Sequence, residues 1–399
     1  MKISSISLVV SSCFPISIYA AALEKSASSV LGFLESGHYA EISFAQVNAN
    51  VSGQVEHQEF IQQLGINDFS TGNLAKTTNI FNATLKFQLQ PHLSLGFIFD
   101  QPYGVDVDYN YSPYIGEIQF AIEAAKIKFK SKNLSTVIGY QPNLHWNIFT
   151  GMSYQTFSGD LKISGQKYLD FNGYHSHFKQ DQAIGWLAGI SYQIPDYAFQ
   201  TTLSYRSKIK HTLETSESIT LPFSTAHNTK IETPQSVSFD FQTGLPQQNL
   251  FYGSIRWVNW QAFEIQPPKF AAVIQAYAAY LPEIANFKMI DYSNDEWNTK
   301  LGLAHQWHPN WFTSIEFLWD SGTGNTASTL NPTDGYRGIG MGAMYKYNRH
   351  LSLASGLYYL DFFQSKVGTS DFAGTQISGL SSVNKNDAWV YGLKVGYHF

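Results

Sequence analysis

The sequence predicts an all-β fold, a transmembrane antiparallel β-barrel of about fourteen strands. Three observations predict it: a two-residue alternation of apolar and polar side chains, a low content of charge, and connections that alternate between short and long. Because successive side chains of a strand point to opposite faces, a period of two residues indicates a strand. The last segment, Trp389 to Phe399, has apolar or aromatic residues at odd positions and mostly small or polar ones at even positions. An edge strand of a soluble β protein would show the same alternation, so the rest of the chain decides between the two.

The composition favours the membrane barrel. Charged residues make up 14% and aromatic residues 16% of the 399 residues. No uninterrupted apolar run approaches the roughly 20 residues that a membrane-spanning helix needs. The net charge of -5 is mild and no basic stripe appears along the chain, which argues against nucleic acid as a partner.

The first twenty residues predict a secretory signal peptide, residues 1–20. Lys2 supplies the positive charge, residues 3–18 are mainly apolar, and Ala20 precedes the expected cleavage. Cys13 lies inside this segment, so the mature chain is expected to have no disulfide framework and no catalytic thiol. A lipoprotein site at Cys13 is the alternative, but the residues after it are apolar, unlike a solvated linker.

Residues 21–38 are expected to form a short N-terminal segment, and residues 39–399 the barrel. The apolar residues of the short segment, such as Phe33, suit packing inside a lumen. Strands are expected at residues 39–52, 79–89, 92–104, 125–141, 145–166, 184–194, 197–213, 233–246, 249–265, 296–307, 311–321, 335–347, 350–363 and 387–399. Short turns on one side and long loops on the other are typical of outer-membrane barrels, and an even strand number places both termini on the short-turn, periplasmic side.

The long loop at residues 266–295 is unusually apolar. Apolar residues at three- and four-residue steps predict a short amphipathic helix, which Pro282 interrupts. One interpretation is that the loop folds over the barrel mouth and packs on other loops. The other is that it collects a hydrophobic ligand on exposed apolar side chains. The residues expected to bind ligand in this second case are Phe270, Ile274, Tyr277, Tyr280 and Leu281.

The third expected strand contains Pro102, Tyr103 and Gly104. Proline cannot donate to a β-ladder, and glycine inside a strand often marks a bulge or a close approach. These residues are either the end of the strand or a kink that opens a gap in the barrel wall.

Basic residues with the polar parity are candidate anchors for a carboxylate head group, chiefly Arg206 and Lys300. The alternative for each is charge pairing across the lumen with residues such as Asp100 or Glu316. No enzyme is expected, because the chain has no GxSxG, HExxH or GxxxxGK[ST] pattern. His175 and His177 lack a clear third ligand, so we expect neither a metal nor a cofactor.

Several stretches together resemble one family. They are LSYRSKIKHTL (203–213), WVNWQAF (257–263), WNTKLGLAHQWHPNWFTSIEFLWDSG (297–322) and AWVYGLKVGYHF (388–399), together with EISFAQVNANVSG (41–53) and FDQPYGVDVDY (99–109). The chain resembles the FadL-type outer-membrane long-chain fatty acid transporters, which also import other hydrophobic compounds. The family fold is a fourteen-stranded barrel.

The resemblance implies a mechanism and a location. It implies capture of fatty acids or hydrocarbons by extracellular loops, and lateral exit beside a kinked third strand, where Tyr103 and Gly104 match. It also implies a barrel, expected to be monomeric, in outer-membrane lipid. The sequence departs from the family in its short N-terminal segment, a reduced hatch without the Asn-Pro-Ala element. The alternative function is a general porin or a structural barrel, although a porin would be expected to carry charged constrictions.

Overall fold

The computed structural model describes residues 23–26, 29–55, 62, 65, 70, 72–112, 114–115, 118–119, 123–219, 227–324, 327–328, 333–363, 366–370 and 376–399. The predicted signal peptide lies outside the described residues.

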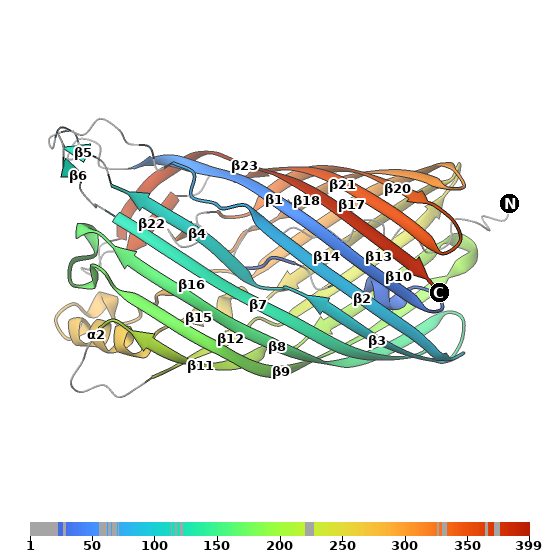
Figure 1. Ribbon diagram of the computed structural model, residues 1–399, viewed down its shortest axis with the longest axis horizontal. Coiled ribbons are helices and arrows are strands. Elements are labelled where there is room, and N and C mark those ends of the chain that lie inside the picture. The colour runs from blue at the N-terminus through green and yellow to red at the C-terminus, as the bar shows by residue number, and fades with distance from the viewer. Residues whose placement is uncertain are drawn as a thin grey trace.

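Within the described residues, 14 antiparallel wall strands close into a barrel (Figure 1). The strands follow one another around the barrel in chain order, so the predicted architecture is confirmed. The barrel closes where β1 (Tyr39–Val55) pairs with β23 (Gln376–His398), with Tyr39 opposite His398. The other wall strands are β2 (Thr78–Gln90), β3 (Leu93–Asp100) continued by β4 (Gly104–Tyr111), β7 (Glu123–Tyr140), β8 (Trp146–Ser164), β9 (His175–Ile194), β10 (Phe199–Arg206) continued by β11 (Ile209–Glu217), β12 (Asn228–Thr233) continued by β13 (Ser236–Leu245), β14 (Asn249–Val258), β17 (Glu296–His308), β18 (Trp311–Asp320), β20 (Tyr336–Lys346) and β21 (Leu351–Phe362).

Shorter elements lie at the ends of the barrel and in its lumen. The one described α-helix, α2 (Pro268–Ala278), confirms the helix predicted in the long loop and lies at the long-loop end (Figure 1). The remaining elements are β5 (Tyr114–Ile115), β6 (Ile118–Gln119), β15 (Glu264–Ile265), β16 (Ile290–Asp291), β19 (Ala327–Ser328), β22 (Lys366–Ser370) and the 3-10 turns η1 (Leu31–Leu34), η2 (Gln166–Phe171), η3 (Pro195–Tyr197), η4 (Trp260–Ala262) and η5 (Pro282–Ile284). No helix in the described part of the chain is long and apolar enough to cross a bilayer.

Several predicted strand boundaries are wrong. The last strand, β23, begins at Gln376 and not at the expected residue 387, and the expected strand 197–213 is divided into β10 and β11. β9 begins at His175, nine residues before the expected start at 184, because polar residues with no apolar alternation fill that stretch. The expected strand 249–265 stops at Val258, where Trp260 turns inward and is fully buried. The expected strand 92–104 is interrupted at residues 101–103.

The outer face carries an apolar belt with aromatic borders. On β18, Trp311 and Trp319 are 49% and 38% exposed, and Ile315 between them is 50% exposed. In an outer-membrane barrel such side chains face lipid over a band about 25 Å tall, with aromatic residues at both interfaces. The terminal Phe399 is 49% exposed at the short-turn end, as the alternation of the last strand predicts.

The inner face is apolar over much of the long-loop half. One cluster of buried apolar residues runs from Phe270 and Ile274 beneath the loops, through Phe129 and Phe178 on the wall, to Tyr103. A second, smaller cluster surrounds η1 nearer the short turns. The N-terminal segment contributes to both clusters, with Leu23 in the first and Phe33 in the second.

Candidate functional site

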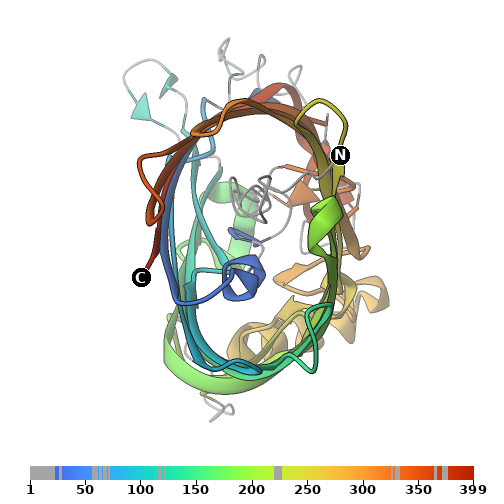
Figure 2. The same ribbon diagram turned by 90° about the vertical axis from the view of Figure 1, so that its right-hand side faces the viewer.

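The N-terminal segment lies inside the barrel, where η1 appears within the ring of strands (Figure 2). Phe33 is fully buried, and its ring meets Phe149 edge to face with 6.0 Å between centroids. Glycines on two wall strands make room for it. A Cβ added at Gly139 would lie 2.9 Å from Phe33 Cζ, and one added at Gly96 would overlap the same ring. The Phe33 ring therefore occupies space that is left free because Gly96 of β3 and Gly139 of β7 have no side chain.

Charged groups hold the end of this segment to the wall. Lys86 is 1% exposed, and its ammonium donates to the backbone carbonyl of Glu35. The Glu35 carboxylate in turn lies 3.5 Å from His398 Nε2 on the last strand. Lys86, which has the polar parity, thus contacts the N-terminal segment.

The third wall strand is interrupted at residues 101–103. Asp100 lies opposite Asn133 of β7, and Gly104 lies opposite Lys130, so three residues face two. An extra residue of this kind is a β-bulge, which bends the strand and disrupts the ladder. The third wall strand therefore carries a bulge at residues 101–103.

The ladder with the preceding strand ends at the same level. β2 pairs with β3 only as far as Ala83 opposite Phe99. Beyond this point, within the described residues, β4 pairs with β7, and its one bridge on the other side joins Val107 to Ala75. The third strand has therefore lost regular pairing with its neighbour along β4.

The N-terminal segment supplies hydrogen bonds at this break. Lys25 N donates to Pro102 O at 2.7 Å, and Gly104 N donates to Leu23 O at 2.7 Å. These two bonds flank Glu24 and Tyr103, which lie opposite each other as an isolated antiparallel bridge. Lipid offers no partner for a free backbone group, so the segment satisfies groups that the wall does not.

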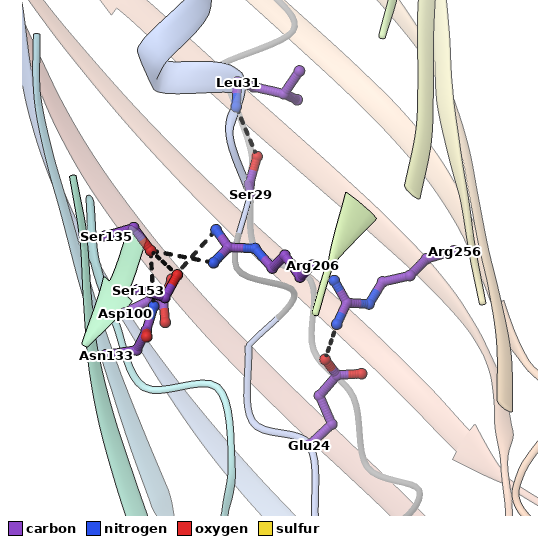
Figure 3. Close-up of polar contacts among 9 residues, drawn as sticks. All are labelled: Glu24, Ser29, Leu31, Asp100, Asn133, Ser135, Ser153, Arg206 and Arg256. Atoms are coloured by element: carbon purple, nitrogen blue, oxygen red, sulfur yellow. Dashed lines mark hydrogen bonds and ion pairs between the residues drawn. The ribbon is translucent and has the colours of Figure 1, made fainter. Parts of the chain in front are cut away.

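Glu24 also contacts the opposite side of the lumen. Its Oε1 lies 2.5 Å from Nη2 of Arg256 on β14, and the two residues are 2% and 4% exposed (Figure 3). Burial raises the pKa of the Glu24 carboxyl to about 7, while the Arg256 guanidinium acts in the opposite direction. The ion pair joins the segment that covers the break to a strand far around the barrel.

Arg206, one of the two predicted anchors, faces Asp100 with Nη2 and Oδ2 3.8 Å apart (Figure 3). Its Nη1 also donates to Ser135 Oγ at 3.4 Å. Charge pairing across the lumen, the alternative weighed for this residue, is thus present. Lys300, the other predicted anchor, lines a luminal pocket together with Asp240 and Leu31.

Trp260 contributes to the site although the sequence pattern placed it in a strand. Its ring meets Tyr103 edge to face at 5.7 Å, and its Nε1 donates to Glu296 Oε2 at 2.5 Å. Tyr103 in turn donates its hydroxyl to Pro234 O at 3.1 Å. The orientation of the Tyr103 side chain is thus fixed by the contact with the Trp260 ring and by the hydrogen bond to Pro234 O.

The loop residues expected to bind ligand have different surroundings. Phe270 and Ile274 are fully buried, and Phe270 packs on Phe171 with 4.8 Å between centroids. Tyr277 is partly buried and donates to Asp170, Leu281 is partly buried, and Tyr280 is 86% exposed. The packed face of the helix therefore includes two of the five residues, and Tyr280 projects into solvent.

A carboxylate fixes the start of α2. Glu217 accepts hydrogen bonds from the backbone N–H groups of Lys269 and Phe270, each at 2.8 Å, and from the Tyr174 hydroxyl at 2.8 Å. A negative group at a helix N-terminus satisfies its free donors and complements the helix dipole. Burial and the neighbouring Glu217 raise the pKa of Tyr174. The helix is thus attached to the end of β11.

Residues 30–399 match the family described as Outer membrane protein transport protein (OMPP1/FadL/TodX). The chain belongs to this family. It is therefore an outer-membrane transport protein and not an enzyme, and members of the FadL/TodX family transport hydrophobic compounds.

Solved structures share the fold of this FadL/TodX member. A FadL homologue of Pseudomonas aeruginosa has a TM-score of 0.66 at 13% identity, over 95% of this chain and 95% of that chain. The Pseudomonas putida toluene transporter TodX has a TM-score of 0.58 at 10% identity, over 93% and 92%. The Ralstonia pickettii toluene transporter TbuX has a TM-score of 0.56 at 10% identity, over 96% and 96%. No curated protein sequence matches the chain.

In this FadL/TodX barrel, sequence reasoning missed Glu24, Arg256 and Glu217. Arg256 has the inward parity of β14, so the alternation could have found it. Glu24 and Glu217 lie outside the regular alternation of the predicted strands, and no local pattern marks their partners. The histidines 175 and 177 lie on the outer face beside Asp160, and no group of residues suited to hold a metal occurs in the described ranges.

Proposed function

We propose that this protein imports hydrophobic compounds, long-chain fatty acids or aromatic hydrocarbons, as a monomer and releases them sideways through the barrel wall at residues 101–104. One observation carries the proposal. Where β2 stops pairing with the third strand, Leu23 and Lys25 of the N-terminal segment pair with Pro102 and Gly104 instead. A part of the chain that is not a wall strand thus completes the wall at this position.

Buried apolar residues extend from the loops to this position, where they adjoin the Glu24–Arg256 ion pair. The buried cluster that contains Phe270 and Ile274 beneath the loops also contains Leu23 and Tyr103 at the break. A lipophile that moved along this cluster would stay out of water, and lateral exit would deliver it to the bilayer without a transfer through the polar periplasm. In this proposal Tyr280 is the first contact, and Phe270, Ile274, Tyr277 and Leu281 line the entry after the loop shifts.

The choice of cargo follows from two considerations. The related TodX and TbuX proteins are toluene transporters, which supports an aromatic hydrocarbon. A fatty acid also needs a partner for its carboxylate. Lys300 is the better candidate of the two predicted anchors, because it lines a luminal pocket beside Leu31 of the N-terminal segment.

Uptake by cells tests the proposal. Cells that produce the protein should take up labelled toluene or labelled oleate faster than cells without it, and Lys300→Met should slow only the uptake of oleate. Pro102→Val together with Gly104→Val should reduce uptake of either compound, because the added Cβ at residue 104 would lie 2.7 Å from Lys25 Cδ and 2.9 Å from Phe129 O. Full uptake by a folded double variant would exclude exit at this position.

A further inference from the structure

Strand β7 carries lysines on the outside of the barrel. Lys126, Lys128, Lys130 and Lys132 are all exposed, while the residues between them point inward and are buried. The expectation that the chain carries no basic stripe is therefore wrong for this part of the wall. The lysines alternate with luminal residues, so their grouping becomes visible only when the two faces of the strand are separated.

These lysines begin where the apolar belt ends. Leu134 of β7 lies opposite Tyr154 of β8, which lies opposite Ile184 of β9. The three side chains are 45%, 43% and 63% exposed and form the border of the apolar belt on the side of the long loops. The next outward residue of β7 toward the long loops is Lys132. On the extracellular side of an outer membrane, this is the level of the lipid head groups.

Part of the positive charge has no carboxylate close to it. Lys126 lies 3.3 Å from Asp108, and Lys128 lies 2.9 Å from Asp106. For Lys130, in contrast, no carboxylate of the described residues lies within the 4.0 Å of an ion pair.

The same holds for Lys132 and for Lys162 of β8 among the residues that the structure describes. Lys162 also lies directly opposite Lys126 in the ladder. Like charges directly opposite each other on one face destabilise a sheet. Asp108, 3.3 Å from Lys126, offsets part of this repulsion, and an anion beside Lys162 would offset the rest.

We propose that this lysine face, composed of Lys126, Lys128, Lys130, Lys132 and Lys162, binds the phosphate groups of lipopolysaccharide, the phosphorylated glycolipid of the outer leaflet. Each ammonium donates charge-assisted hydrogen bonds to phosphate oxygens. Alternate residues of a strand lie about 7 Å apart, so neighbouring lysines reach separate oxygens of one extended head group. The acyl chains of the same molecule lie against Leu134, Tyr154 and Ile184.

The arrangement favours a lipid over a free anion. A free phosphate would contact only the lysines, whereas lipopolysaccharide also covers the exposed apolar row directly below them. Basic groups at a membrane surface attract anionic lipids with about 1 kcal/mol each, or roughly fivefold in affinity. The lysines and the apolar row beside them therefore match the order of phosphate groups and acyl chains in lipopolysaccharide.

Titration of the folded protein with purified lipopolysaccharide in nonionic detergent tests the proposal. The variant Lys130→Gln, Lys132→Gln and Lys162→Gln should bind at least about tenfold more weakly than the unaltered protein. The charge-conserving variant with arginine at the same three positions should keep the affinity. A control with Lys346→Gln and Arg349→Gln removes positive charge at the short-turn end and should bind as the unaltered protein does.

Two further ligands separate the sources of phosphate. Dephosphorylated lipopolysaccharide should bind the unaltered protein as weakly as lipopolysaccharide binds the triple variant, and inorganic phosphate in excess should not displace lipopolysaccharide. Heat-modifiable migration on gels verifies that each variant is folded. Equal affinity of the triple glutamine variant, equal loss in the short-turn control, or full displacement by inorganic phosphate would each overturn the proposal.

Discussion

The carboxylate of Glu24 lies 2.5 Å from the guanidinium of Arg256, and both groups are buried inside the barrel. The contact joins residues far apart in the chain, one in the N-terminal segment and one on β14. Because Glu24 also lies opposite Tyr103, the ion pair holds the N-terminal segment against the interruption of the third strand. The stability of this contact therefore determines how firmly the break is covered.

Arg256→Gln should release the N-terminal segment from the break. Removal of one partner of a buried ion pair typically costs 3–5 kcal/mol, because the other charge is left uncompensated. Hydrogen exchange of the Lys25 and Gly104 amides, which pair across the break, should become at least about 100-fold faster. Arg337→Gln is the matched control, since that exposed arginine pairs with Asp361 at 2.8 Å on the outer face. Unchanged protection in Arg256→Gln would refute the role of the ion pair.

The covering of the break should weaken as pH rises. The ordinary pKa of Glu24 is 4.5, and in the buried position the pKa is raised to about 7 by burial, with Asp320 and Asp100 adding to the rise and Arg256 opposing it. A raised pKa means that the docked segment holds a proton more tightly than the released one. The N-terminal segment is therefore docked most stably below pH 4.5, and its docking free energy weakens as the pH rises from 4.5 to about 7.

The loss of docking stability should be visible in hydrogen exchange at the Lys25 and Gly104 amides, corrected for the intrinsic effect of pH. Protection of these amides should fall about 10- to 100-fold between pH 5 and pH 8, since one pKa unit corresponds to about tenfold in an equilibrium constant. Glu24→Gln should abolish the pH dependence. A pH dependence that survives in Glu24→Gln would assign the effect to another group.

Phe33→Ala should open the lumen toward the short-turn end. The ring fills the slot over Gly96 and Gly139, and loss of a buried phenylalanine side chain typically costs 3–5 kcal/mol. Ion conductance of the barrel in planar bilayers should rise. Leu31→Ala, in the same turn but only partly buried, should have a smaller effect. Equal conductance of both variants would show that Phe33 does not close the lumen.

Two single variants of the long loop separate packing from capture. Phe270→Ser removes a fully buried ring and should loosen α2, increasing proteolysis of the loop, whereas Tyr280→Ser changes a side chain that is 86% exposed and should leave the loop intact. Slower uptake by Tyr280→Ser at normal protein level would support capture by this residue. Slower uptake by Phe270→Ser alone would support the packing interpretation of the loop.

The alternation of side chains predicts the barrel because each wall strand has one face toward lipid and one toward the lumen. Trp389 and Phe399 show this, since both are exposed at the parity that the sequence predicts. Pro102 and Gly104 are unusual within a strand and mark the region of the break, but the sequence did not separate the end of a strand from a kink.

The contacts across the lumen were not predictable in the same way. Glu24 and Arg256 meet only once the barrel has closed, and no local pattern specifies which charged residues face each other. Trp260 is a similar case. Its apolar character fits a wall strand, but a carboxylate on the neighbouring strand, Glu296, accepts its indole N–H and holds it inside.

A reversible covalent lock tests the central claim most directly. Glu24 and Tyr103 form the non-hydrogen-bonded pair of an antiparallel bridge, in which Cα atoms lie about 4.5 Å apart, close enough for a disulfide. In Glu24→Cys with Tyr103→Cys, oxidation should fix the N-terminal segment over the break and stop uptake of a hydrophobic compound, and reduction of the same protein should restore uptake. Equal uptake by the oxidised and reduced forms, with the disulfide verified, would contradict passage through the wall at residues 101–104.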